Sequence, residues 1–186
     1  MLADWMQGPY VFKLYKEYNY SDKDIAILFV IGFGTSGITG AFIGSITDRF
    51  GRKLSCLSFC IFYSLCCLTK HYHNLNMLLI GRFLGGISTS LLFSSFESWM
   101  VTTHHEKKFP NDKLGETFGL AWGYNSVIAV IAGIITSFAV NAYKKYNIVG
   151  GTQNNSTPYE VAAFDCSAVV LIISFIIIIY SWNENY

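Results

Sequence analysis

The sequence predicts an all-α membrane protein, a bundle of six transmembrane helices. Two observations support this fold class. Of the 186 residues, 52% are hydrophobic and only 13% are charged, whereas a soluble domain carries about 25% charged residues. The charges are also unevenly placed, because none occurs in residues 25–47, 117–143 or 166–183. Uncharged stretches of about 18 residues or more are typical of membrane-spanning helices.

Six apolar segments follow one another along the chain. We expect helices over residues 1–14, 25–47, 54–69, 75–99, 117–143 and 161–182. The third segment reaches only about 24 Å at 1.5 Å per residue. Lys53 and Lys70 flank this segment, and we expect both side chains to extend to the lipid headgroups.

The first segment is too short to cross a hydrocarbon core of about 30 Å. It has no basic region and no cleavage site, so it does not fit a signal peptide. We therefore expect that residues 1–186 form one domain, a fragment that begins inside a helix. We also expect further protein after Tyr186, because the sixth segment ends just before it.

Composition argues against several other classes of protein. The net charge is +1 and the basic residues are scattered, which disfavours nucleic-acid binding. No nucleophile–base pair or metal-ligand cluster is visible, so we expect no enzyme, no cofactor and no metal site.

We expect the four histidines to be solvated in loops. We also expect that one carboxylate, Asp165, needs no special role. Four cysteines on one apolar stretch are expected to be packing residues: Cys56, Cys60, Cys66 and Cys67.

Small residues recur along the second segment at intervals of four. This spacing places them on one helix face and lets helices approach closely in lipid, so we expect this helix to be buried among its neighbours. The same region contains G-x-G-x-x-G at residues 32–37, which is the spacing of a dinucleotide-binding loop. A dinucleotide site would require a helix with a water-facing side after these glycines, and no such helix is expected here. The residues of the small face are Gly32, Ser36, Gly40 and Gly44.

A charged loop separates the second and third segments. Residues 44–53 have the spacing G-x-x-x-D-R-x-G-R-K, with Gly44 at its start. Gly51 permits a tight turn, and Asp48 is expected to act as a conformational latch among nearby cations. The alternative is a basic loop that only anchors to lipid headgroups. The cations are Arg49, Arg52 and Lys53.

This spacing resembles the signature loop of the major facilitator superfamily. Four further motifs resemble the molybdate-anion transporters, one branch of that superfamily: Asp-Trp-Met-Gln-Gly-Pro-Tyr at 4–10, Gly-Arg-Phe-Leu-Gly-Gly at 81–86, Phe-Glu-Ser-Trp at 96–99 and Trp-Asn-Glu-Asn-Tyr at 182–186. The resemblance covers the whole chain but only the amino-terminal half of a twelve-helix transporter. It implies two inverted three-helix repeats, alternating access and a missing carboxy-terminal six-helix half.

Charges inside apolar segments indicate a site, because each costs about 2.5–3.5 kcal/mol or more at the bilayer centre. Arg82 lies within the fourth segment, and Asp4 lies in the first segment. The resemblance implies that both helices line a central cavity. The alternative is an Asp4–Arg82 ion pair that only stabilises the bundle. Gly86, Thr89, Phe93 and Glu97 follow Arg82 on one helix face. The candidate substrate or coupling residues are Asp4, Gln7, Arg82, Thr89, Glu97 and Asn125.

The resemblance implies secondary transport of a small oxyanion, with molybdate as substrate. The planar donors of an arginine suit an oxyanion, and Asp4 or Glu97 are candidates to carry a coupling proton. Two alternatives remain: a sugar-like or other organic solute as cargo, and a membrane scaffold or adaptor that transports nothing.

Glycosylation sequons suggest how the chain is oriented. Asn19, Asn154 and Asn155 begin sequons in loops that lie on one side of the predicted helices, whereas basic residues are equally frequent on both sides. We therefore expect the 44–53 loop in the cytoplasm of a multi-pass protein, with the plasma membrane as its location.

Overall fold

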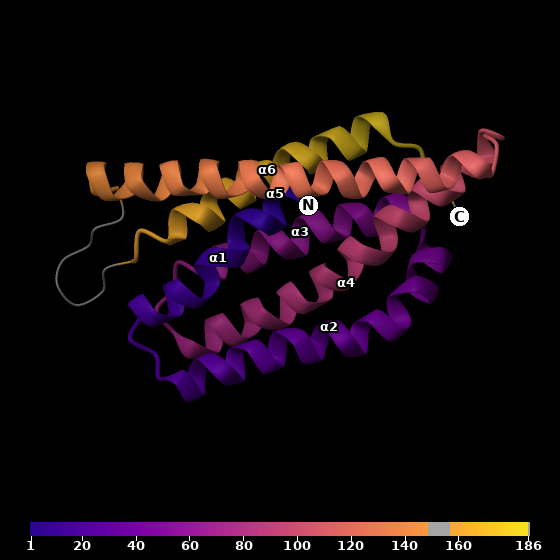
Figure 1. Cartoon of the computed structure of the whole chain (residues 1–186). Coiled ribbons are helices and arrows are strands. Elements are labelled where there is room, and N and C mark those ends of the chain that lie inside the picture. The colour runs from indigo at the N-terminus through magenta and orange to yellow at the C-terminus, as the bar shows by residue number, and fades with distance from the viewer. Residues whose placement is uncertain (149–156, 186) are drawn as a thin grey trace.

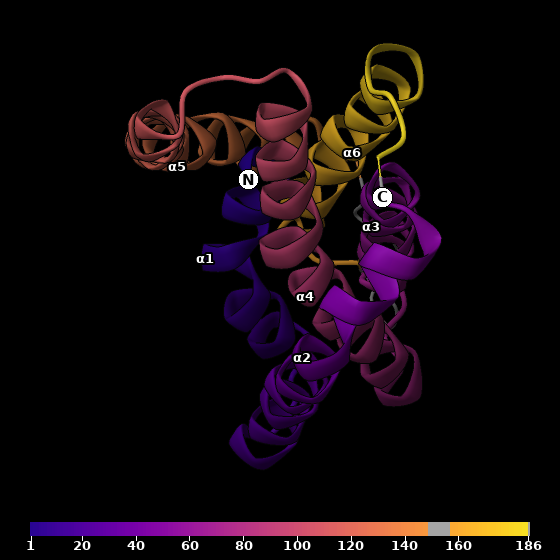
Figure 2. The ribbon, with the colours of Figure 1, turned by 90° about the vertical axis from the view of Figure 1, so that its right-hand side faces the viewer.

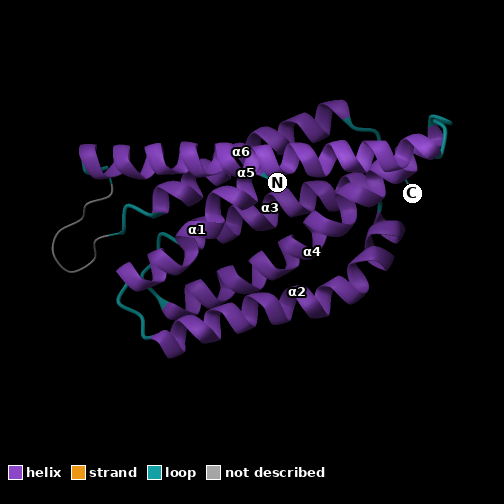
Figure 3. Ribbon diagram, viewed as in Figure 1, coloured by secondary structure: helices purple, strands orange, loops and turns teal. Residues whose placement is uncertain are grey.

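The computed structural model describes residues 1–148 and 157–185, and its regular structure is entirely helical (Figures 1 and 3). In the described residues, five helices are long and apolar enough to cross a bilayer, which is every helix except α1. The prediction of an all-α chain with six helices is confirmed over the described residues. The helices are α1 (Leu2–Glu17), α2 (Asp22–Phe50), α3 (Arg52–Thr69), α4 (Leu75–Glu106), α5 (Asp112–Tyr146) and α6 (Val161–Ser181).

Most of the described helices extend beyond the apolar segments that predict them, α4 and α5 the furthest. Helix α4 continues to Glu106 instead of ending near residue 99, and α5 begins at Asp112 instead of near residue 117. The added first turn of α5 contains an ion pair of 2.8 Å between Lys113 and Glu116, at the i, i+3 spacing that favours helix. Polar sequence can remain helical outside the hydrocarbon, so the apolar run underestimates helix length.

The described turns alternate between the two ends of the bundle. The turns after α1 and α3 lie at one end, and those after α2 and α4 lie at the other (Figure 1). Asn19, in the first turn, has a positive φ of 58°, which asparagine tolerates better than most residues. The Asn19 sequon and the 44–53 loop therefore lie at opposite ends. Asn154 and Asn155 lie outside the described residues.

Helix α4 packs against both α2 and α3, while α6 packs against both α3 and α1. Helix α5 lies along α1 and α6, and the view along the bundle shows α5 and α2 at its edges (Figure 2). The core contains apolar residues from five helices, among them Leu14, Leu28, Phe59, Leu91 and Phe164. Four free, buried thiols also lie in it, as the sequence predicts: Cys56, Cys60, Cys66 and Cys67.

Helices α2 and α4 approach closely through small residues. A Cβ atom added to Gly86 would lie 2.6 Å from the carbonyl oxygen of Gly32, so a side chain at this position would force the helices apart. One turn further, the Ser90 hydroxyl donates to the carbonyl oxygen of Ser36 at 2.8 Å. The prediction that the small face of α2 packs against a neighbour is confirmed, and that neighbour is α4.

The prediction that α2 is buried as a whole is wrong for the described chain. Its opposite face is exposed at Val30, Phe33 and Phe42, whose exposed fractions are 70%, 73% and 63%. The periodic small residues indicate one packing face, and they carry no information on the other. The apolar residues on that other face are what a lipid or a further protein surface would cover.

Candidate functional site

A cavity of about 340 Å³ lies between α1, α2, α3 and α4. Four residues predicted from the sequence line it: Asp4 and Gln7 from α1, and Arg82 and Thr89 from α4. Lys70, which directly follows α3, lines it as well. We call this space the Arg82 cavity. Its size suits a small solute, because ligand cavities span about 300–1,000 Å³.

The guanidinium of Arg82 lies against aromatic rings rather than against a carboxylate. Its central carbon is 4.2 Å from the ring centroid of Phe29 and 5.4 Å from that of Tyr15. The Nε and Nη2 atoms are buried and have no hydrogen-bond partner among the described residues. A buried, unpaired donor costs free energy, so these atoms would gain from an anion once a small movement of the side chain or of a ring exposes them to the cavity.

Lys70 is a cavity residue that the sequence analysis missed. It was expected to extend to the headgroups, but it is only 1% exposed. Its Nζ atom donates a hydrogen bond of 3.0 Å to the hydroxyl of Tyr15. The Arg82 cavity therefore contains two cationic side chains, and neither forms an ion pair with a carboxylate of the described residues.

Asp4 accepts a hydrogen bond of 2.6 Å from the hydroxyl of Tyr63, on α3. Asp4 and Arg82 line the same cavity, but they form no ion pair with each other in the described structure. The alternative in which this pair only stabilises the bundle is therefore not realised. Each of the two charges has its own neighbours, which leaves the space between them open to a solute.

Gln7 and Thr89 line the cavity with their donors already used. The amide nitrogen of Gln7 donates to the hydroxyl of Ser167 at 2.8 Å and to the sulfur of Cys67 at 3.3 Å. The hydroxyl of Thr89 donates to the carbonyl oxygen of Gly85 at 2.9 Å. Both side chains therefore shape the cavity, and the free donors in it belong to the cations.

Glu97 and Asn125 line a second cavity, of about 260 Å³. Its walls are mostly apolar, and Asn125 accepts a hydrogen bond of 3.0 Å from the indole of Trp5. The single stripe expected from Arg82 to Glu97 is thus divided between two cavities, with an exposed Phe93 between them. We call the second space the Glu97 cavity.

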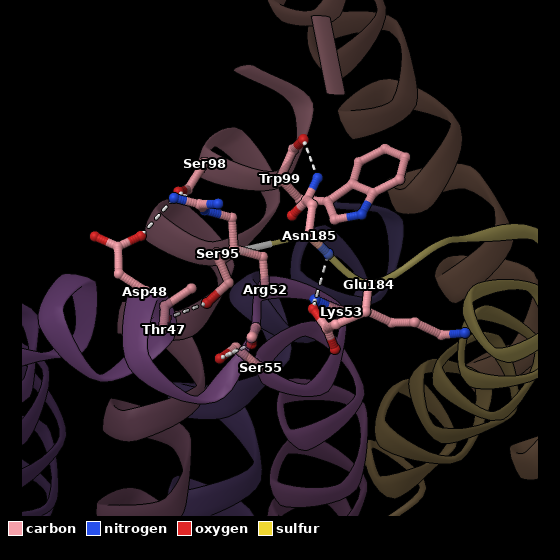
Figure 4. A network of polar contacts seen from close by, with 11 residues as sticks. Thr47, Asp48, Arg52, Lys53, Ser55, Ser95, Ser98, Trp99, Glu184 and Asn185 are labelled. Carbon is pink, nitrogen blue, oxygen red and sulfur yellow. Dashed lines mark hydrogen bonds and ion pairs between the residues drawn. The ribbon is translucent and has the colours of Figure 1, made fainter. Parts of the chain in front are cut away.

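Residues 44–53, which the sequence predicts as a loop, are helical except for Gly51, which joins α2 to α3; we keep the name 44–53 loop for this segment. Arg52 organises its contacts. Its Nη2 atom lies 2.7 Å from Asp48, and its Nε atom donates to the hydroxyl of Ser98, on α4, at 2.7 Å (Figure 4). Asp48 therefore pairs with one cation of the three expected. Lys53 instead donates to the carbonyl oxygen of Ile179 at 2.9 Å, and Arg49 lies 5.9 Å from the ring centroid of Phe50.

The last described residues return to this loop, which the sequence analysis did not foresee. Glu184 accepts hydrogen bonds from the backbone nitrogens of Lys53 at 2.8 Å and Leu54 at 3.1 Å, at the start of α3. Asn185 donates to the carbonyl oxygen of Trp99, on α4, at 3.2 Å (Figure 4). Gly51 has a φ of 102°, and a Cβ atom there would lie 2.6 Å from the Glu184 carboxyl carbon. The loop is thereby connected to α2, α4 and the end of α6.

Two of the four histidines have structural partners, so the expectation that all are solvated is wrong. His71 lies 2.7 Å from Asp165, which also accepts a hydrogen bond of 3.0 Å from Tyr143. His104 is buried and lies 3.1 Å from the carbonyl oxygen of Pro110. No group of three or more histidine, cysteine or acidic side chains that could hold a metal ion is found in residues 1–148 and 157–185.

Comparison with known proteins identifies the family. A family described as sugar transporters with twelve transmembrane helices matches residues 1–186. The chain belongs to this family of the major facilitator superfamily. A molybdate-anion transporter of Xenopus tropicalis is 40% identical over all of this chain and 38% of its own length. That of Danio rerio is 43% identical over 73% of this chain and 28% of its own length. No solved structure matches.

This facilitator chain thus spans about two fifths of the length of the Xenopus relative. The resemblance to molybdate-anion transporters, which rests on the motifs at 4–10, 81–86, 96–99 and 182–186, is confirmed. In the structure, the first two of these motifs contribute to the Arg82 cavity, and the superfamily motif at 44–53 spans the junction of α2 and α3.

Proposed function

We propose that the protein containing this chain is a secondary active transporter of molybdate or a similar tetrahedral oxyanion, working by alternating access. The relatives carry the name molybdate-anion transporter. The observation that carries the proposal is the half-buried Arg82, which lines a cavity and whose Nε and Nη2 atoms are buried without a hydrogen-bond partner among the described residues. Two donors on a rigid plane match two oxygens of an oxyanion.

A sugar-like or other organic solute is the second candidate, because the family description names sugars. The charges of the Arg82 cavity favour the anion. A neutral solute would leave Lys70 and Arg82 uncompensated in a desolvated space, and isolated buried charges are costly. A scaffold without transport would gain nothing from such a cavity, so the site also disfavours that alternative.

We infer that α1–α3 and α4–α6 are inverted repeats, and that a second six-helix half completes the transporter. The family description gives twelve helices, and the exposed apolar face of α2 offers a surface for such a half. The protein would be a multi-pass component of the plasma membrane, with the 44–53 loop in the cytoplasm. The solute would cross chemically unchanged, so no enzymatic step is proposed.

Uptake of a dianion into an inside-negative cell is unfavourable by about 4.6 kcal/mol per 100 mV, twice the cost for one charge. Transport must therefore be coupled to cations or driven by a steep concentration gradient. Asp4 lines the Arg82 cavity, whereas Glu97 lines the other cavity. A proton on Asp4 would offset charge next to the bound anion, and we propose Asp4 as the first coupling candidate.

The proposal is tested by uptake of labelled molybdate into cells expressing the intact protein. Arg82→Ala should abolish uptake, and Arg82→Lys should weaken apparent affinity, because it keeps the charge and loses the two-pronged geometry. The control is Phe83→Ala, on the exposed face of the same helix. Wild-type uptake by a well-expressed Arg82→Ala variant would exclude the oxyanion site, and competition by a sugar instead of molybdate would favour the second candidate.

A further inference from the structure

Lys70 is held in the Arg82 cavity by contacts from α1. Its Nζ atom donates to Tyr15, while the hydroxyl of Tyr18 donates to its carbonyl oxygen at 2.7 Å. Burial raises the pKa of the Tyr18 phenol above its ordinary value, and the hydroxyl is protonated at neutral pH in either case. The backbone and side chain of Lys70 are thus both fixed, unlike those of a lysine that extends freely to the headgroups.

Lys70 and Arg82 converge on one aromatic ring. The Lys70 ammonium nitrogen and the Arg82 guanidinium carbon each lie 5.4 Å from the ring centroid of Tyr15. Gly81 leaves room for this arrangement, because a Cβ atom there would lie 3.3 Å from the Lys70 Nζ and 2.0 Å from the Thr69 hydroxyl. The fold therefore places two like charges next to the same aromatic ring.

The charges along the cavity wall are unbalanced. Among the described residues that line it, two are cations and one, Asp4, is a carboxylate; Asp4 is bonded to Tyr63 rather than to either cation. With Asp4 ionised, the charged residues of the wall sum to one positive charge, and with Asp4 protonated, as the coupling proposal has it, they sum to two. In the protonated form an anion with one negative charge would leave one cation uncompensated, whereas an anion with two would neutralise both. Uncompensated charges are strongly unfavourable in a desolvated site.

We propose that Lys70 is a second ligand for the oxyanion and that, together with Arg82, it selects divalent over monovalent tetrahedral oxyanions. The proposal rests on the proposed function, since it takes the Arg82 cavity as the transport site. To the proposed function it adds Lys70 as a residue that determines specificity, and it states that the preferred substrate carries two negative charges. Lys70 supplies a point charge, and Arg82 supplies directional donors.

The experiment compares binding of molybdate and perrhenate, which is a tetrahedral oxyanion of similar size with a single charge. Binding is measured on the purified intact protein in lipid nanodiscs. The wild type should prefer molybdate. Lys70→Met should weaken molybdate binding by about tenfold or more (about 1.4 kcal/mol per factor of ten) and leave perrhenate binding unchanged or stronger. Lys70→Arg should keep the preference, and Lys145→Met, exposed on α5, is the matched control.

The possible failures are distinguishable. If the wild type binds neither anion, the proposed function is wrong. If the wild type binds perrhenate as tightly as molybdate, the selectivity proposal is overturned, and this comparison does not depend on whether any variant folds. If Lys70→Met weakens both anions by the same factor, Lys70 is a packing residue of Tyr15 and the proposal is overturned as well.

Discussion

Arg82 is an unusual residue because its burial is only partly compensated. The rings of Phe29 and Tyr15 face the guanidinium, and such contacts stabilise a desolvated cation by about 2 kcal/mol. Two of its nitrogen atoms still have no acceptor among the described residues. Both atoms have almost no exposed surface, so an anion in the cavity would reach them only after a small movement of Arg82 or of a neighbouring ring. The affinity of the site would therefore include the cost of that movement.

The first prediction concerns the coupling of uptake to a proton gradient. Asp4→Asn should leave molybdate binding intact and remove the dependence of uptake on a proton gradient, because asparagine resembles the protonated carboxyl. Uptake at imposed pH gradients measures this effect. Tyr63→Phe is the control, since it removes the hydrogen bond to Asp4 and keeps the carboxylate. Gradient-dependent uptake by Asp4→Asn would contradict the assignment and point to Glu97 instead.

Sequence reasoning found Arg82 and Asp4 because a charge inside an apolar run is visible without any structure. It missed Lys70, which lies at the border between an apolar segment and a polar loop, where lysines usually reach the headgroups. The burial of Lys70 depends on the hydroxyl of Tyr15 and on the space at Gly81. These contacts come from two other helices, so only the packing could reveal them.

At the level of helices, the contact of α2 with α4 is a direct consequence of sequence. Gly86→Ala should lower stability by about 1–3 kcal/mol, the usual cost of overpacking, because its Cβ would contact the backbone of Gly32. Thermal unfolding in detergent, followed by tryptophan fluorescence, measures the change.

The control for this substitution is Gly123→Ala, which lies on α5 with nothing within 4 Å of the added carbon. It should not destabilise the protein, since alanine favours helix more than glycine does. A Gly86→Ala variant as stable as wild type would mean that α2 and α4 can separate without cost, and the close approach would lose its structural importance.

The turn between α2 and α3 gives a prediction on kinetics. Asp48→Asn should slow transport without preventing membrane insertion, because Arg52 would lose its carboxylate and keep only Ser98. The pair is partly exposed, so a change in conformational balance is expected rather than unfolding.

Arg49→Gln is the matched control for the turn, because Arg49 forms no ion pair in the described structure. It should change the rate less than Asp48→Asn does. Initial rates of uptake, normalised to surface expression, provide the measurement. Normal kinetics in a well-expressed Asp48→Asn variant would exclude a latch in this loop.

The latch motif was visible in the sequence, but its partners were not. The spacing of residues 44–53 predicted a tight turn with clustered charges, and Gly51 has the positive φ that such a turn requires. The contacts of Glu184 with the start of α3 join residues about 130 positions apart. Local spacing carries no information on such a pairing, so it had to come from the fold.

For the whole molecule, the sequence and the fold both bear on how the chain is oriented in the membrane. Asn19 and the 44–53 loop lie at opposite ends of the bundle. We predict that Asn19→Gln removes a glycan from the protein expressed in eukaryotic cells, seen as a mobility shift on gels. Protease added outside intact cells should not cut within residues 104–113. Cleavage there, or a glycan attached there, would invert the proposed topology.

The number of helices followed from hydropathy because the bilayer imposes a minimum length on each apolar run. How those helices pack around two separate cavities did not follow from it. The stripe from Arg82 to Glu97 is continuous along α4, yet different neighbours cover its two ends. Helical periodicity determines which residues share a face, whereas the surrounding helices determine which of them share a cavity.

The central claim is that an oxyanion binds in the Arg82 cavity, and the most direct measurement locates the ion. Crystals of the intact protein grown with tungstate, a heavier analogue of molybdate, would reveal tungsten by anomalous scattering. We predict a peak in the Arg82 cavity, beside the guanidinium of Arg82 and the ammonium of Lys70. A peak in the Glu97 cavity instead, or none in the Arg82 cavity at a tungstate concentration that blocks molybdate uptake, would contradict this account.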